Sequence, residues 1–213
     1  MVSALERSAL AARCVSCLFL LATWEGCATS MKKIKKAAVP ILVLVGVMWV
    51  IEFVNWSSGH SFTHFGIVPR TADGLAGIPL APFLHGSVAH MASNTVPLLI
   101  LGGLVALSGA GRLLSTTVVV AILGGFGVWL MGRPAVHIGA SILIFGYFGY
   151  LLALALYERS VRSAVLAVIT LVLYSGMIWG VLPQERHISW EGHLFGFLGG
   201  IAAARLMRKS RSR

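Results

Sequence analysis

The chain has 213 residues, of which 57% are apolar and only 11% are charged, and its formal net charge is +10. An ordinary soluble domain carries about 25% charged residues, so this composition excludes a water-soluble globular protein. The Lys and Arg residues flank apolar stretches and do not form a domain with interleaved aromatic side chains. This arrangement argues against nucleic acid and favours anionic lipid as a partner.

The first 30 residues combine Arg7 and Arg13 with the apolar segment 14–24, a pattern that imitates a secretory signal peptide. Cleavage there would leave the cluster Lys32–Lys36 outside the membrane, against the charge bias of every other loop. We therefore interpret residues 1–30 as a dispensable extension, with Met31 as an alternative translation start, and residues 31–213 as the membrane domain. All three Cys residues lie in the extension, so they predict neither disulfides in the fold nor a zinc site.

Six apolar segments are each long enough to cross a bilayer as a helix, which takes about 20 residues. They predict an all-α polytopic membrane protein with six transmembrane helices. The segments run from Ala37 to Val54, Val88 to Ser108, Leu113 to Met131, Ile138 to Tyr157, Ala164 to Leu182 and Trp190 to Met207. A stretch of about 33 residues, from Asn55 to Ser87, separates the first two and is too long for a mere connector.

The positive residues predict the orientation, because Lys and Arg concentrate on the cytoplasmic side of membrane proteins. With the N-terminus inside, twelve of them are cytoplasmic and only Arg70, Arg133 and Arg186 are outside. The twelve are Lys32, Lys33, Lys35, Lys36, Arg112, Arg159, Arg162, Arg205, Arg208, Lys209, Arg211 and Arg213. We therefore expect a multi-pass protein of the plasma membrane with both termini in the cytoplasm.

Four polar residues are expected at one depth of the membrane. The second, fourth and sixth spans all enter from the outside, and near their outer ends they carry His90 and Asn94, then Ser141, then His193. Polar side chains are costly in a bilayer, so each is a functional candidate. A single one would more often bond a neighbouring helix, but four at one depth favour a common site.

Small residues predict a close contact between the fourth and sixth spans. Gly196 and Gly200 lie three and seven residues after His193, on its side of the helix, where they let a neighbouring backbone approach. The fourth span offers small residues of its own, namely Gly139, Ala140, Gly146 and Gly149. Such a contact would bring Ser141 and His193 together.

These residue types suit acyl transfer. A serine hydroxyl becomes a nucleophile when an adjacent base takes its proton, and His is the usual base, so we expect Ser141 and His193 to form a dyad. Glu191 lies two positions from His193 and would point elsewhere on the helix, which disfavours a triad. His90 and Asn94 lie four apart on one helical face, where both could donate hydrogen bonds to an oxyanion together with the Ser141 backbone N–H.

Three segments resemble the motifs of the rhomboid family of intramembrane serine proteases. Residues 85–94, HGSVAHMASN, are similar to the family's H-x-x-x-x-H-x-x-x-N. Residues 139–141, Gly-Ala-Ser, look like the start of its G-x-S-G, and residues 193–200 look like its H-x-x-G-x-x-x-G. The resemblance covers residues 37–207 and places the motifs on the second, fourth and sixth spans, in the family's order.

The resemblance implies a six-helix bundle in which Ser141 is the nucleophile, His193 the base, and His90 and Asn94 line the oxyanion hole. The supporting residues would be His85, in the loop before the second span, Gly139, and Phe145, where the family commonly has a Tyr against the base. The implied activity is that of a serine endopeptidase that cleaves single-span membrane proteins near the outer face. No cofactor and no metal are implied.

Two rival functions differ from this one. Ile142 follows the nucleophile where the family has Gly, and a branched side chain there favours a pseudoprotease that binds transmembrane helices without cutting them. If Ile142 faces lipid or an adaptable gap, we expect an active enzyme. A transporter would scatter polar residues through the full membrane depth, whereas the inner halves of these spans are almost purely apolar.

The remaining polar residues predict no further site. The histidines of the outer loops and span ends are interpreted as solvated or interfacial, and these are His60, His64, His137 and His187. Arg70 is interpreted as an exposed loop charge near Asp73. Glu52, near the outer end of the first span, is assigned no role.

Overall fold

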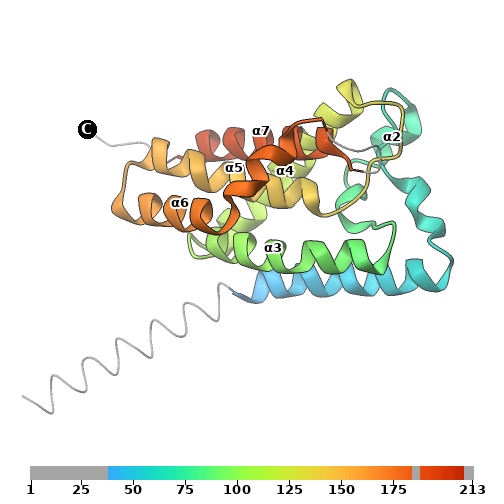
Figure 1. Cartoon of the computed structure of the whole chain (residues 1–213), viewed down its shortest axis with the longest axis horizontal. Coiled ribbons are helices and arrows are strands. Elements are labelled where there is room, and N and C mark those ends of the chain that lie inside the picture. Colours follow the sequence, from blue (N-terminus) through green and yellow to red (C-terminus); the bar gives the residue numbers. More distant parts are fainter. Residues whose placement is uncertain (1–37, 184–187, 209–213) are drawn as a thin grey trace, which may run out of the picture.

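The computed structural model describes residues 38–183 and 188–208, and these form a bundle of helices (Figure 1). The predicted extension 1–30 with its Cys residues lies outside the described residues. So do the cluster Lys32–Lys36, the residues Arg186 and His187, and the C-terminal residues from Lys209 onward.

Five helices of the described part are long and apolar enough to cross a membrane. They are Ala38–Ser57, α3 (Val88–Ala106), α4 (Ala110–Met131), α5 (Ser141–Glu158), and α6 (Val161–Tyr174) together with its continuation η3 (Ser175–Val181). A sixth, α7 (Trp190–Leu206), has 17 residues and occupies the last predicted span. The prediction of an all-α polytopic membrane bundle is therefore confirmed.

Helices α3 and α7 begin where short polar side chains cap them, whereas α4 and α5 have no side-chain cap. The Ser87 hydroxyl accepts the His90 N–H at 3.1 Å at the start of α3. The Ser189 hydroxyl accepts the Gly192 N–H at 3.2 Å at the start of α7. A cap of this kind satisfies one of the free N–H groups of a first helical turn. Both caps thus determine where the polar residues His90 and His193 enter their helices.

Helix α5 is the central element, and most of its residues are buried between α7, α4, α3 and α6. Glycines make the contact with α7 possible, as the sequence predicts. A Cβ on Gly200 would collide with the Gly146 carbonyl oxygen, and one on Gly149 would collide with the Phe197 carbonyl oxygen. The backbones of α5 and α7 therefore touch along their length. Ala38–Ser57 lies beside α3 (Figure 1), where the Trp49 indole N–H donates to the Thr95 hydroxyl at 3.1 Å.

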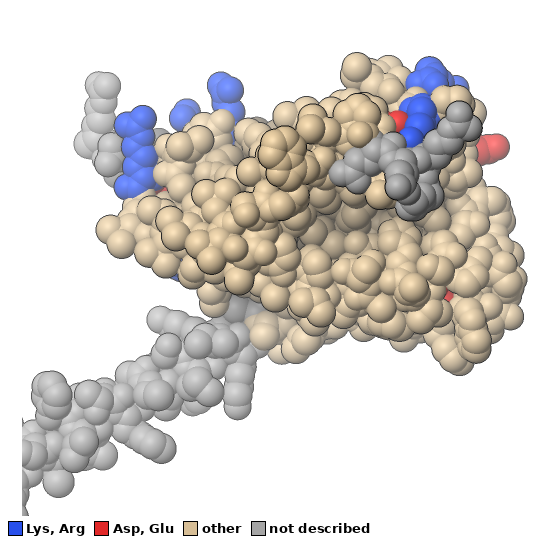
Figure 2. Space-filling view, in the orientation of Figure 1, with Lys and Arg blue, Asp and Glu red and all other residues tan. Residues whose placement is uncertain are grey.

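The long segment between the first two spans folds into short elements at one end of the bundle. These are η1 (Ser61–Phe65), α2 (Ala72–Ala76) and η2 (Ala81–Phe83). An isolated antiparallel bridge joins Ile67 to His137, so this segment is tied to the loop that leads into α5. On the face drawn in Figure 2, Lys and Arg gather at the two ends of the molecule and leave an almost uncharged band between them. That pattern agrees with a multi-pass membrane protein.

Arg70 corrects one interpretation from the sequence. It is exposed, as expected, but it is not a free loop charge: its guanidinium donates to the carbonyls of Leu130 and Gly132 at 3.2 and 2.9 Å. Carbonyls at the end of a helix lack partners within the helix, and a cation there is favourable. Arg70 therefore caps the end of α4.

Candidate active site

Ser141 is the first residue of α5, at the end of the bundle that carries the long segment between the first two spans. Gly139 precedes it with φ +119°, a backbone conformation that L side chains rarely adopt. The sequence predicts Gly139 as a small residue inside a span, and that is wrong, because it forms the turn that leads into the helix. A Cβ on Gly139 would also lie 2.9 Å from the His90 ring and 3.8 Å from the Ser141 Oγ. Glycine is therefore required here both for conformation and for space.

His193 lies in the first turn of α7 and is held from two sides. Its Nδ1 is 2.9 Å from the Gly180 carbonyl oxygen in η3. Because that oxygen can only accept, Nδ1 carries the proton and Nε2 keeps its lone pair. The imidazole also stacks on the Phe145 ring, with centroids 4.0 Å apart and planes inclined by 6°. A backbone carbonyl and an aromatic ring thus hold one tautomer and one orientation.

Glu191 does not take part in holding His193. It is buried, and its carboxylate lies 3.4 Å from the Arg133 Nε and accepts the Arg133 backbone N–H at 3.3 Å. The expectation that Glu191 points to another side of the helix agrees with this geometry. Its partner Arg133 also donates to the Ile188 carbonyl, which ties the loop before α5 to the loop before α7.

One cavity brings the four predicted residues together. It has a volume of about 630 Å³ and is lined by Ser141, His193, His90 and Asn94 among others. Asn94 is buried at 8% exposure, and its Nδ2 has no hydrogen-bond partner among the described residues. A buried amide donor without a partner is uncommon in native proteins and usually marks a functional role. This one borders a cavity that is also lined by the Ser141 hydroxyl and by the imidazoles of His90 and His193.

His85 supports the backbone beside Ser141. It is fully buried, and its Nε2 accepts the Ala140 N–H at 3.1 Å. Burial, and secondarily the nearby His90, lower the pKa of His85 to about 3, so the ring is neutral, as its acceptor role requires. Asn55, near the C-terminal end of the first helix, donates from Nδ2 to the His85 carbonyl at 3.0 Å. Through His85, the first helix thus reaches the residue preceding Ser141.

His137 is a residue of this cavity that the sequence interpretation misses. It is buried at 4% exposure and is not solvated; its Nδ1 lies 2.7 Å from the Ser189 hydroxyl and its Nε2 3.1 Å from the Arg133 carbonyl. Burial lowers the pKa of His137, so a neutral ring links the N-terminal cap of α7 to the loop before α5. Its position shortly before Ser141 is the only signal for this role in the sequence.

Glu52 and His60 form a contact that the sequence does not predict. Glu52 is buried at 1% exposure, and one of its carboxylate oxygens is 3.2 Å from the Nε2 of His60. His60 is the N-terminal cap of η1, so the pair joins the first helix to the segment that follows it.

Ile142, which differs from the family motif, has a specific place in the packing. It is 5% exposed, and its Cδ1 would lie 3.2 Å from a Cβ on Gly124 of α4. Its backbone faces α7, where a Cβ on Gly196 would collide with the Ile142 carbonyl oxygen. The side chain is therefore buried beside Gly124, next to the space that a side chain at position 124 would occupy. The additional volume at position 142 is balanced by the missing side chain at position 124.

Comparison with known proteins identifies the family. The model of the Rhomboid domain matches residues 74–210, which contain His85, His90, Asn94, Ser141 and His193. An uncharacterized protein of Mycobacterium tuberculosis is 39% identical over 185 residues, which are 81% of this chain and 77% of that protein. An uncharacterized protein of Mycobacterium leprae is 37% identical over 187 residues, or 82% of this chain and 74% of that protein. The chain therefore belongs to the rhomboid family.

Proposed function

We propose that this chain is an intramembrane serine endopeptidase with a dyad of Ser141 and His193. The observation that carries the proposal is the cavity in which a hydroxyl, an imidazole of fixed tautomer and an unpartnered amide meet. The Gly180 carbonyl takes over one role of the carboxylate in a triad, because it holds the proton on Nδ1 and leaves Nε2 free to act as a base.

The reaction would be acyl transfer in two steps. The Ser141 Oγ attacks the carbonyl carbon of the scissile bond while the His193 Nε2 takes the hydroxyl proton and then gives it to the leaving amine. In the second step, water attacks the resulting ester, His193 again accepts a proton, and the Ser141 hydroxyl is restored. The polar cavity gives water a route to the ester.

Charge on the carbonyl oxygen would be stabilised by hydrogen-bond donors from two helices. The Asn94 Nδ2 has no competing partner, and the His90 ring lies beside Gly139, next to Ser141. The Ser141 backbone N–H is in the first turn of α5, where helical N–H groups have no acceptor within the helix. Donors preorganised in this way are often the largest single contribution to catalysis.

The substrates would be single-span proteins of a bacterial plasma membrane, cleaved near its outer face. The excess of Lys and Arg at the opposite end of the bundle supports this orientation, with both termini in the cytoplasm. The packing of Ile142 beside Gly124, with the backbones of α5 and α7 still in contact, supports an enzyme over the rival function of a pseudoprotease.

The proposal is tested by labelling the purified chain with a fluorophosphonate probe, which reacts with activated serines without needing the substrate. We expect labelling of the wild type, and none for Ser141→Ala or His193→Ala. Ser93→Ala is the matched control, because Ser93 borders the same cavity but its hydroxyl donates to the His90 carbonyl at 2.8 Å. A wild type that is folded but inert, or a His193→Ala variant that still reacts, would contradict the dyad.

A further inference from the structure

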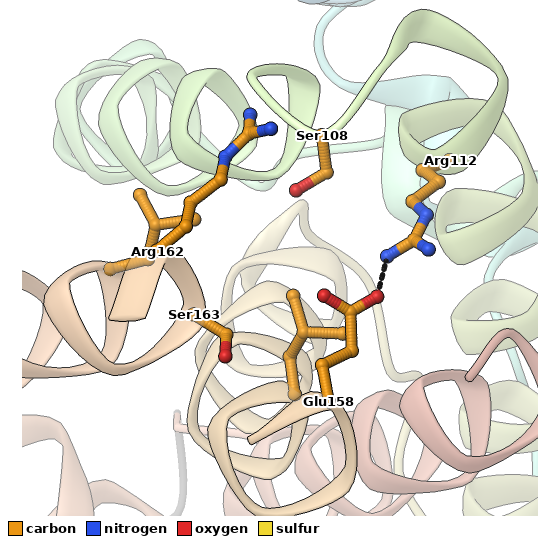
Figure 3. A pocket seen from close by; sticks show the side chains of 7 residues that line it. Ser108, Arg112, Glu158, Arg162 and Ser163 are labelled. Carbon is orange, nitrogen blue, oxygen red and sulfur yellow. Dashed lines mark hydrogen bonds and ion pairs between the residues drawn. The ribbon is translucent and has the colours of Figure 1, made fainter. Parts of the chain in front are cut away.

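A second polar pocket lies at the end of the bundle opposite Ser141. It has a volume of about 100 Å³ and is lined by Ser108, Arg112, Leu154, Glu158, Arg162, Ser163 and Leu166. Figure 3 shows the side chains of Arg112 and Arg162 entering it from two helices, with the Ser108 hydroxyl between them. The residues come from the loop after α3 and from α4, α5 and α6, so four consecutive elements meet here. The site is separate from the cavity that contains Ser141.

The pocket has an unbalanced positive charge. The Arg112 Nη1 lies 2.5 Å from a carboxylate oxygen of Glu158, and this pair is neutral as a whole. Arg162 has no carboxylate partner among the described residues, and it donates to the Leu107 carbonyl. One positive charge therefore remains in a pocket that is also lined by the hydroxyls of Ser108 and Ser163 and by two leucine side chains. Arg162 is exposed, so this charge is accessible to an anion at the surface of the bundle.

The hydrogen-bonding groups of the pocket also suit an anion. The Ser108 hydroxyl makes no hydrogen bond with any other described residue, so it is a free donor. The Ser163 hydroxyl, in contrast, already donates to the Ser160 carbonyl at 2.9 Å and belongs to the cap of α6. Two guanidinium groups and a hydroxyl around a space this small match the oxygens of one phosphate group.

The position of the pocket indicates where that phosphate comes from. Ser141 and Glu158 are the first and last residues of α5, and 18 residues of helix span roughly 27 Å. The hydrocarbon core of a bilayer is about 30 Å thick, so a helix that begins near one headgroup layer ends near the other. The pocket thus lies at the depth of lipid phosphates, and the orientation proposed above makes these the phosphates of the cytoplasmic leaflet.

We propose that this pocket binds the phosphate of an anionic phospholipid, with Arg162 and Ser108 as its main donors and Arg112 as a further one. The residual charge of the pocket equals the single negative charge of a phosphodiester, whereas a zwitterionic headgroup would bring a second cation beside the two arginines. Basic pockets between transmembrane helices are known to hold such headgroups.

The test measures lipid binding to the full chain in detergent by native mass spectrometry. The protein is titrated with phosphatidylglycerol, with phosphatidylcholine of the same acyl chains, and with inorganic phosphate. We expect phosphatidylglycerol to bind more tightly than phosphatidylcholine. Arg162→Gln and Ser108→Ala should both weaken the binding of phosphatidylglycerol. The loss in Arg162→Gln should be about tenfold, because a charge-assisted hydrogen bond is lost. Arg159→Gln is the control, because Arg159 is exposed at the same end of the bundle but is not part of the pocket.

Three outcomes would overturn the proposal. Equal affinity of the wild type for both lipids would show that the pocket does not select an anion. An equal loss in Arg159→Gln and Arg162→Gln would show that only the net charge of this end matters. Inorganic phosphate that binds as tightly as the lipid would identify a soluble anion as the occupant. The variant Arg112→Gln/Glu158→Gln removes the ion pair without changing the net charge, and we expect it to bind phosphatidylglycerol more weakly than the wild type.

Discussion

Replacing Ile142 by Gly restores the residue of the family motif but should destabilise this chain. Ile142 is 5% exposed and fills the space beside Gly124. Truncating a buried Ile to Ala costs about 2–5 kcal/mol, and Gly costs a helix about 1 kcal/mol more than Ala. We therefore expect Ile142→Gly to lower the free energy of unfolding by about 3–6 kcal/mol and to leave probe labelling at or below the wild-type level.

The matched control for this change is Ile122→Gly. Ile122 lies on α4 and is 55% exposed, so its replacement loses the helix contribution of about 1 kcal/mol but no buried packing. The difference between the two variants isolates the packing of Ile142, and both are measured by unfolding in detergent alongside fluorophosphonate labelling. A Ile142→Gly variant as stable as the wild type and labelled at least about tenfold faster would refute this reasoning, because Ile142 would then hold the nucleophile away from its base.

A complementary change is Gly124→Ala, whose Cβ would lie 3.2 Å from both the Gly196 Cα and the Ile142 Cδ1. We expect Gly124→Ala to slow fluorophosphonate labelling in the wild-type background, and to slow it less when it is combined with Ile142→Gly. Gly111→Ala, on the same helix with nothing within 4 Å of the new Cβ, should be harmless. Strictly additive effects of Gly124→Ala and Ile142→Gly would show that the two positions are independent.

Three further predictions concern the site and its orientation. His90→Ala and Asn94→Ala should each slow cleavage of a model transmembrane substrate by about 10²- to 10³-fold. Wild-type rates in both variants would show that these two side chains have a structural role and do not stabilise the oxyanion. His85 has a folded-state pKa of about 3, below its ordinary 6.5, so the unfolded chain binds a proton at a higher pH than the folded chain does. The free energy of unfolding should therefore fall as the pH drops from 6.5 towards 3. His85→Gln should make the unfolding midpoint less dependent on pH in this range. A Cys at Arg162, after replacement of the three native Cys, should react with an impermeant reagent only from the cytoplasmic side, and labelling from outside would reverse the topology.

The spans and their contacts follow from local features of the sequence. A run of about 20 apolar residues has few alternatives to a membrane helix, and Ser87 and Ser189 provide caps where α3 and α7 begin. The stripe of Gly196 and Gly200 predicts the contact between α5 and α7, because small residues on one face of a membrane helix let a neighbouring backbone approach closely.

Long-range contacts could not be predicted in this way. His137 is buried and forms a bridge to Ile67, 70 residues earlier, and no periodicity in the sequence predicts such a bridge. The partner of the His193 Nδ1 is a backbone carbonyl of Gly180, a group that every residue type carries. That carbonyl is aimed at His193 because the fifth span ends as the 3-10 helix η3, whereas the hydropathy pattern predicts one uninterrupted helix. Gly139 looks like a packing residue in the sequence, and only its φ of +119° shows the turn.

The contact between α5 and α7 through Gly146, Gly149 and Gly200 has a consequence for conformational entropy. Glycine has no side-chain rotamers, so these three residues lose no χ freedom when the backbones come together. The same contact between leucines would immobilise side chains on both helices, without the gain from leaving water that offsets this loss in a soluble protein. Ser141 and His193 are thus carried by two helices whose closest contacts are made by glycines, which have no side-chain freedom to lose.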